Sequence, residues 1–249
     1  VFSQSYFVIP DYQRDYAWEK SNVNDLLDDI RFVYRQNNKQ DKKVDHYFGT
    51  LVLEERGSVE PTDFEDYDVY GIVDGQQRLA TVAIVISAIV DEMQNIQTSD
   101  EIGADISSTI NDRKEDIEKK YIQYEGIERI KLGGLAEDAY ENVILKGQSP
   151  EDYLNQGDIV DAERKIAIAR QATTERLQRW KADKYQNGST DHAGYYKFLN
   201  SLVKILTQRF EVNIKVVEDV DEAARMFKVI NDRGRDLRLH DKVRSHLVY

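Results

Sequence analysis

The feature that most constrains the fold is the turn Asp74-Gly75-Gln76-Gln77-Arg78. Residues 67–73 before it are rich in aromatic and β-branched side chains, which predicts a strand. An apolar segment begins at Leu79 and predicts a helix to about Gln97. Because glycine adopts backbone conformations closed to other residues, Gly75 permits a tight turn between the two. A strand leading directly into a helix is typical of α/β and α+β proteins.

This turn has two interpretations on spacing alone, which does not decide between them. In the first, the free N–H groups of the new helix bind phosphate, and Arg78 adds a permanently charged guanidinium. Asp74 would then contact magnesium or orient a water molecule. In the second, Asp74 is simply the helix N-cap and the two glutamines are solvated.

Three further segments accompany the turn. The first is 9–19, which contains Tyr12-Gln13-Arg14, and the second is 47–53. The third is 226–234, which ends in Asn231-Asp232-Arg233-Gly234. In this order the four blocks resemble the DGQQR-motif family of ParB/sulfiredoxin-like domains. That family includes the N-terminal domains of GmrSD-type (type IV, modification-dependent) restriction enzymes and of phosphorothioate-sensing defence proteins. The resemblance spans nearly the whole chain and is weakest between about Gln97 and Gln208.

The resemblance implies a regulatory domain that binds and hydrolyses a nucleoside triphosphate with Mg²⁺. It assigns catalysis to Asp74, Gln76, Gln77 and Arg78, with Asp74 as the magnesium ligand, and nucleotide or phosphate binding to Tyr12, Gln13, Arg14, Gly75, Arg78, Asn231, Arg233 and Gly234. Either Gln76 or Gln77 would orient the attacking water. The implied partners are modified double-stranded DNA and a C-terminal HNH-type nuclease domain, and the implied location is the cytoplasm. No HNH motif occurs in these 249 residues, which look like a fragment of a longer protein.

Other readings of the same residues remain open. Arg14 and Arg233 can instead form surface ion pairs with Asp11, Asp15 or Asp232, where such pairs contribute little. Tyr12, Tyr16 and Trp18 form either a base-stacking platform or core anchors, and we favour the anchor for Trp18. The chain also departs from the family pattern, with Asp15 where proline is frequent and with Lys242 and Arg244 in the final segment.

Two other functions compete with a nucleoside triphosphatase. The first is a non-enzymatic module that recognises modified DNA through the pocket of Arg14 and Arg78. The second is a ParB-like clamp that closes on DNA with nucleotide, which we rank last because no basic helix-turn-helix follows the core.

Composition excludes several classes of protein and site. A formal net charge of −12 argues against non-specific wrapping of nucleic acid, although a local basic pocket is compatible with it. The absence of cysteine excludes disulfides and thiolate metal sites. There is no P-loop or Rossmann glycine pattern, and no pair of histidines has metal-ligand spacing. The apolar run 79–90 predicts a buried helix too short to span a membrane.

We therefore expect an α+β fold, a small ParB/sulfiredoxin-like mixed sheet with a mainly helical subdomain. The expected parts are a core over 1–97, helices over 98–208, and a returning strand with helices over 209–249. Strands are expected at 6–9, 47–54, 67–73 and 210–217, with a small hairpin over 121–132. Helices are expected from residue 21 or 22 to 34, and at 76–97, 135–145, 158–184, 195–209, 221–230 and 240–249. Residues 35–43, the acidic stretch between the two central strands, and 98–108 are expected to be loops.

Overall fold

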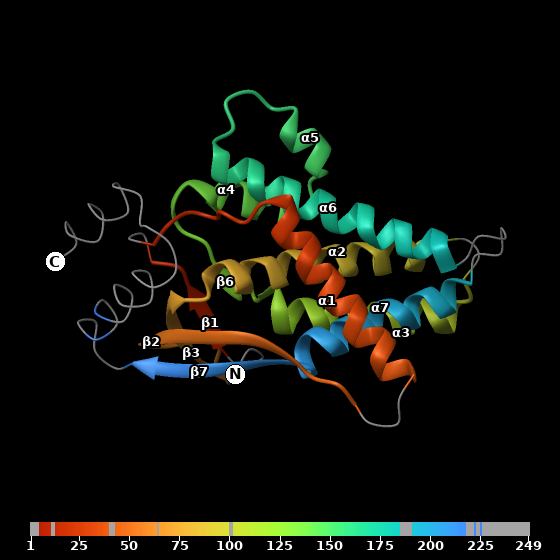
Figure 1. Cartoon of the computed structure of the whole chain (residues 1–249), viewed down its shortest axis with the longest axis horizontal. Coiled ribbons are helices and arrows are strands. Elements are labelled where there is room, and N and C mark those ends of the chain that lie inside the picture. The colour runs from red at the N-terminus through yellow and green to blue at the C-terminus, as the bar shows by residue number, and fades with distance from the viewer. Residues whose placement is uncertain are drawn as a thin grey trace.

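A computed structural model describes residues 5–10, 13–39, 43–63, 65–99, 102–184 and 191–217, together with Glu222 and Arg225. It confirms an α+β fold, in which a mixed sheet lies at one side of the molecule and long helices cover its inner face (Figure 1). The expected helices at 221–230 and 240–249 lie outside the described residues.

The five-stranded sheet has the order β6-β1-β3-β2-β7. Its strands are β1 (Ser5–Val8), β2 (His46–Thr62), β3 (Glu65–Asp74), β6 (Ile130–Lys131) and β7 (Phe210–Val217). Only the central β2–β3 pair is antiparallel, while β1–β3, β1–β6 and β2–β7 are parallel. The alternating pattern of 210–217 therefore correctly predicted that the chain returns to the sheet after its helical section.

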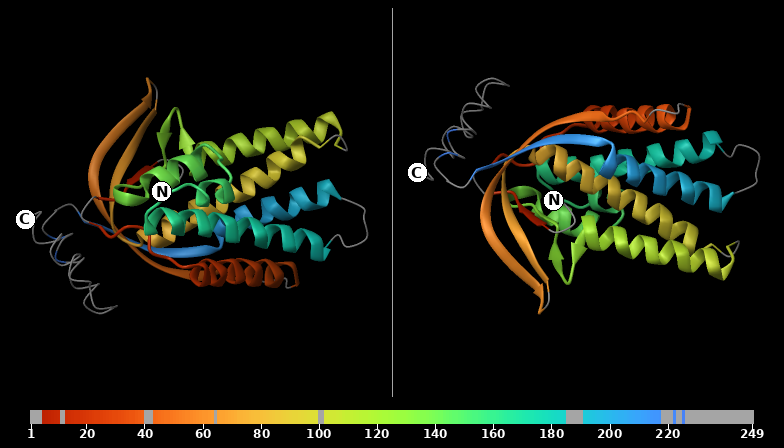
Figure 2. Two further views of the ribbon diagram at one scale, coloured as in Figure 1. Left: turned by 90° about the horizontal axis from the view of Figure 1, so that it is seen from above. Right: turned by 90° about the horizontal axis from the view of Figure 1, so that it is seen from below.

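The hairpin of β2 and β3 is longer than expected. The acidic stretch taken for a loop continues both strands, because Ser58 pairs with Asp68 and Thr62 with Glu65. Register shifts interrupt the pairing at three places, and Figure 2 shows the hairpin curving strongly. The small hairpin is confirmed as β4 (Gln123–Tyr124) and β5 (Ile127–Glu128), but the next residues leave it as β6 and pair with β1.

The long helices are α1 (Lys20–Lys39), α2 (Gln76–Gln97), α3 (Ala104–Tyr121), α6 (Asp161–Lys184) and α7 (His192–Gln208). The buried face predicted for the first of them is correct: Val23, Leu26, Leu27, Ile30 and Val33. Two expected loops are wrong, since α1 extends to Lys39 and α3 already begins at Ala104. The expected helix over 135–145 is divided into a 3₁₀ turn η2 (Gly134–Ala136), a short α4 (Glu137–Ala139) and a π-helix η3 (Tyr140–Leu145). A further short helix, α5 (Pro150–Leu154), was not expected.

Helix α2 is the centre of the molecule. It packs against α3, α6 and α7, which run beside it away from the hairpin (Figure 2). One continuous hydrophobic core joins its side chains to those of the sheet and the other helices. By length and hydropathy alone α2 is apolar enough to cross a membrane, but 78% of its apolar window is buried inside the protein, the position of a core helix.

Candidate functional site at the start of helix α2

Gly75 forms the turn between β3 and α2. It is the N-cap of α2 with φ 98° and ψ 6°, a left-handed conformation that favours glycine, and no side chain caps the helix. Of the two interpretations left open by the sequence, the one in which Asp74 is the N-cap is therefore wrong. The first hydrogen bond of the helix runs from Leu79 N to Gly75 O at 3.1 Å, so the N–H groups of residues 76–78 face the open end of the helix.

Arg78 is held beside this turn by two acceptors. Its Nη2 donates to Thr50 O at 2.5 Å and to Asp74 Oδ2 at 3.2 Å. Its guanidinium also lies against Gly49, where a Cβ atom would come within 2.9 Å of Nη1. With 28% of its side chain exposed, Arg78 is fixed in place while still reaching solvent at the turn.

Three glutamines join the turn to the loop before α1. Gln13 Nε2 donates to Val73 O at 3.0 Å, and Gln76 Nε2 donates to Arg14 O at 2.5 Å. Gln77 Nε2 donates to Asp15 O at 3.1 Å, while Gln77 Oε1 accepts from Ala17 N at 2.8 Å. Gln76 and Gln77 are only 5% and 6% exposed, so the reading in which they are solvated is wrong. Two of the sequence blocks thus meet through side-chain to main-chain bonds.

A cavity of about 150 Å³ lies where the loop and the turn meet. It is lined by Gln13, Arg14, Trp18, Val73 and the whole Asp74–Arg78 turn. Arg14 is exposed and forms no ion pair with any described residue. Asp15, one of the partners considered for it, instead accepts a hydrogen bond from Leu135 N at 3.0 Å and so ties the loop to η2.

The aromatic residues of the loop have different positions. Tyr16 is 5% exposed and its hydroxyl lies 2.8 Å from Thr81 Oγ1, so it is a core anchor and not a stacking surface. Burial raises the pKa of Tyr16 well above its usual range. Trp18 is partly buried against the core, as favoured, and also lines the cavity.

A comparison with models of protein families shows to which family this chain belongs. The family model described as "GmrSD restriction endonuclease, N-terminal domain" matches residues 1–248. The chain belongs to this family. It is therefore a domain of a restriction system, and its role is in defence. No curated protein matches the chain.

Four of the residues implied for this family's site lie outside the described part of the chain: Tyr12, Asn231, Arg233 and Gly234. The structure does bring together the remaining ones, namely Gln13, Arg14 and the turn from Asp74 to Arg78. Among the described residues, no group of three or more histidines, aspartates or glutamates is placed to hold a metal ion. A magnesium ion here would rely on Asp74, whose side chain is 34% exposed and shares one oxygen with Arg78.

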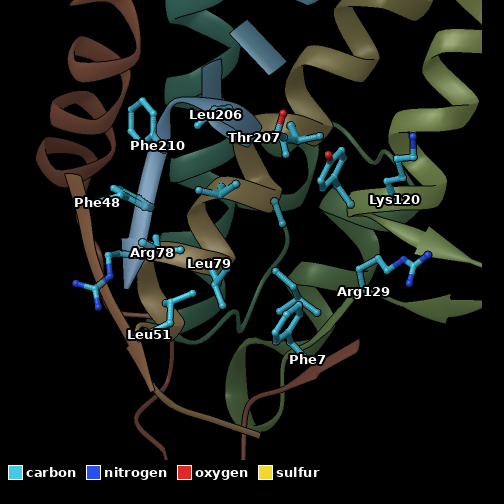
Figure 3. Close-up of a pocket in the computed structure, with 16 residues that line it drawn as sticks. Phe7, Phe48, Leu51, Arg78, Leu79, Lys120, Arg129, Leu206, Thr207 and Phe210 are labelled. Carbon is cyan, nitrogen blue, oxygen red and sulfur yellow. The ribbon is translucent and has the colours of Figure 1, made fainter. Parts of the chain in front are cut away.

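Sequence reasoning missed a second cavity, of about 230 Å³, which Arg78 also lines (Figure 3). Its walls are mostly apolar and come from β1, β2, β6, β7, α2 and the ends of α3 and α7. Figure 3 shows the guanidinium groups of Arg78 and Arg129 extending away from its centre on opposite sides. The head of Arg129 lies 4.7 Å from the ring centre of Tyr6 and 4.6 Å from that of Tyr67. Arg78 thus borders both cavities. The larger one is mostly apolar, although Lys120 and Arg129 also line it, whereas the one at the turn combines two arginines with a carboxylate and the start of a helix.

Proposed function

We propose that this chain binds and hydrolyses a nucleoside triphosphate, and that this reaction controls the nuclease of a modification-dependent restriction protein. The observation that carries the proposal is the cavity at the start of α2. There, two arginines, one carboxylate and the N–H groups of the first helical turn, which have no partner among the described residues, surround the same space.

Each of these groups suits one part of a triphosphate. Helix N–H groups and the positive end of the helix dipole favour phosphate oxygens. Arg14 and Arg78 add two positive charges within a protein of net charge −12, so the attraction is local and does not extend to polyanions in general. Asp74 is suited to share a magnesium ion with the phosphates, which neutralises charge that develops during transfer. Trp18 supplies an aromatic face for the base.

The first test is phosphate release from ATP, GTP, CTP and UTP with magnesium, with and without modified DNA. We expect wild-type protein to hydrolyse at least one of them and Arg78→Ala to lose about 100-fold or more in kcat/KM, as for loss of a charge-stabilising donor. Arg179→Ala is the matched control, because Arg179 is 69% exposed on α6, away from the turn. It should hydrolyse at the wild-type rate.

Because Arg78 also bonds Thr50 and Asp74, its loss can weaken the fold. Arg14→Ala removes an exposed side chain with no ion pair to a described residue, so it tests the same pocket with little effect on stability. Normal turnover in both Arg14→Ala and Arg78→Ala would show that the nucleotide site lies elsewhere.

Two other results would favour other functions. Nucleotide binding without turnover, lost in Arg78→Ala, would indicate a nucleotide switch. Preferential binding of modified duplex DNA with no nucleotide present would favour the non-enzymatic recognition module.

A further inference from the structure

Gln76 and Gln77 are adjacent, equally buried and chemically identical, but they are used differently by the fold. Gln77 bonds the main chain with both ends of its amide, accepting from Ala17 N and donating to Asp15 O. Both of its polar atoms are committed to holding residues 15–17 against α2. Gln77 is therefore a structural clamp, and reaching a ligand would require it to release the loop.

Gln76 bonds the main chain with one end only. Its Nε2 donates to Arg14 O at 2.5 Å. Since a carbonyl oxygen only accepts, the nitrogen must face it, and this fixes which end of the amide points elsewhere. The remaining atom, Oε1, is buried and has no hydrogen-bond partner among the described residues.

An unpaired buried acceptor is uncommon in a folded protein and calls for a donor. Gln76 lines the cavity of about 150 Å³ at the turn. The oxygens of an ionised triphosphate are acceptors and cannot satisfy Oε1, whereas a water molecule or a hydroxyl group can. Among the described residues that line this pocket, Gln76 Oε1 is the buried side-chain acceptor without a partner, and it is matched to a nucleophile and not to the phosphate itself.

We propose that Gln76, and not Gln77, positions the attacking water during nucleoside triphosphate hydrolysis. This inference rests on the proposed function and assigns a role within the same site. Gln76 Oε1 accepts a hydrogen bond from one O–H of the water and directs its lone pair toward the γ-phosphorus. The water oxygen bonds to phosphorus as the bond from the γ-phosphorus to the β,γ-bridging oxygen breaks. That oxygen leaves with the electron pair as nucleoside diphosphate, and the water proton passes to a phosphate oxygen.

A purely structural role is the competing explanation. Gln76 also borders a second, very small cavity of about 10 Å³, shared with Ile9, Asp15, Tyr16 and Leu132. This is close to the space that one buried water occupies. If Oε1 is satisfied by such a water, Gln76 contributes to folding and not to the reaction.

The test compares Gln76→Met with the matched variant Gln77→Met. Met keeps the length of the side chain and removes both polar atoms. The measurements are kcat, KM, the affinity for the non-hydrolysable imido analogue of whichever triphosphate the wild type hydrolyses, and the unfolding midpoint. For Gln76→Met we expect kcat to fall by about 100-fold with analogue affinity within about threefold of wild type. For Gln77→Met we expect a lower unfolding midpoint and a smaller change in kcat.

A second variant, Gln76→Glu, gives a readout that a structural role would not produce. A carboxylate at this position can accept the water proton, so kcat should gain a new ionisation in its pH profile that the wild-type amide lacks. A folded Gln76→Met protein with wild-type kcat would overturn the inference. So would a loss of analogue affinity with a raised KM and an unchanged kcat, because it would place Gln76 in binding alone. If wild-type protein neither binds nor hydrolyses any of the four triphosphates, the proposed function fails and this inference with it.

Discussion

At the scale of a single residue, the backbone conformation of Gly75 sets the position of the candidate site. Its φ of 98° is unfavourable for any residue with a side chain, and a Cβ atom there would lie 2.2 Å from Leu51 Cδ2. We expect Gly75→Ala to lower the free energy of unfolding by about 2–4 kcal/mol, combining backbone strain with overpacking against Leu51. It should also weaken nucleotide hydrolysis, because the turn would shift the first N–H groups of α2.

Gly57→Ala separates the two contributions. Gly57 also has a positive φ, of 86°, but a Cβ atom there would meet nothing within 4 Å. Gly57→Ala should therefore lower the free energy of unfolding only by the backbone strain, about 1–2 kcal/mol. Guanidinium denaturation of both variants measures the difference, and equal losses would mean that Leu51 moves aside freely.

The residues of the turn show what a sequence can and cannot predict at this scale. Gly75 is predictable, because its conformational freedom is a local property. The burial of Gln76 and Gln77 is not, since the acceptors and donors that bury them belong to residues 14–17, about sixty positions earlier. Polar side chains in a first helical turn are usually solvated, and only the approach of a distant loop reverses that.

At the scale of elements, the sequence predicted those helices and strands whose apolar residues recur with a regular period. The buried stripe of α1 and the existence of strand β7 followed from periodicity alone. The predicted apolar face of β7 is only partly correct, because Ile214 and Val216 are exposed. The length of β2 and β3 did not follow from periodicity, because acidic residues far from the core are held in strands by pairing with each other. Helix α5 was missed although Ser149 accepts from Asp152 N and Pro150 begins the helix, a recognisable start signal in a very short element.

Arg170 links α6 to α2, and this contact should be important for stability. It is 4% exposed, donates to Asp91 and to Thr174, and burial lowers its pKa while Asp91 opposes that shift. Asp91→Ala leaves a buried guanidinium without its carboxylate, and we expect a loss of about 1–3 kcal/mol in the free energy of unfolding. Arg170→Met should cost less, because it removes the charge together with the need for a partner.

Asp28→Ala is the control for this element contact. Asp28 pairs with Arg176 at 2.5 Å between α1 and α6, but the side chain of Arg176 is 21% exposed against 5% for Arg170, so this guanidinium reaches solvent. An exposed pair is expected to contribute at most about 1 kcal/mol. Urea denaturation of the three variants measures these losses. If Asp91→Ala lowers the free energy of unfolding no more than Asp28→Ala does, the contact between Arg170 and Asp91 is not important for stability.

At the scale of the whole molecule, the acidic surface and the continuous core have separate consequences. A net charge of −12 leaves this chain poorly suited to bind DNA by charge alone, so contact with modified DNA would depend on local recognition or on other parts of the protein. The core, in contrast, encloses tyrosines that keep their protons, and this makes stability depend on pH.

We expect the folded state to lose stability at alkaline pH. Burial raises the pKa of both Tyr16 and Tyr140 from the ordinary value of 10.0, and nearby Glu128 raises that of Tyr140 further. Below pH 10 the folded and unfolded chains both keep these protons, so the contribution is complete. Above pH 10 the unfolded chain releases them while the folded chain does not, so the free energy of unfolding falls by up to about 1.4 kcal/mol per pH unit for each tyrosine.

Tyr140→Phe tests this dependence directly. The Tyr140 hydroxyl is buried with no partner among the described residues, so its removal should leave stability at pH 8 unchanged or slightly higher. Tyr16→Phe should instead cost about 1 kcal/mol at pH 8, because it removes the bond to Thr81. Urea denaturation at pH 8, 9.5 and 11 should show a shallower alkaline loss in each variant than in wild type. Since lysines and exposed groups titrate equally in all three proteins, parallel curves would show that these two tyrosines do not set the alkaline limit.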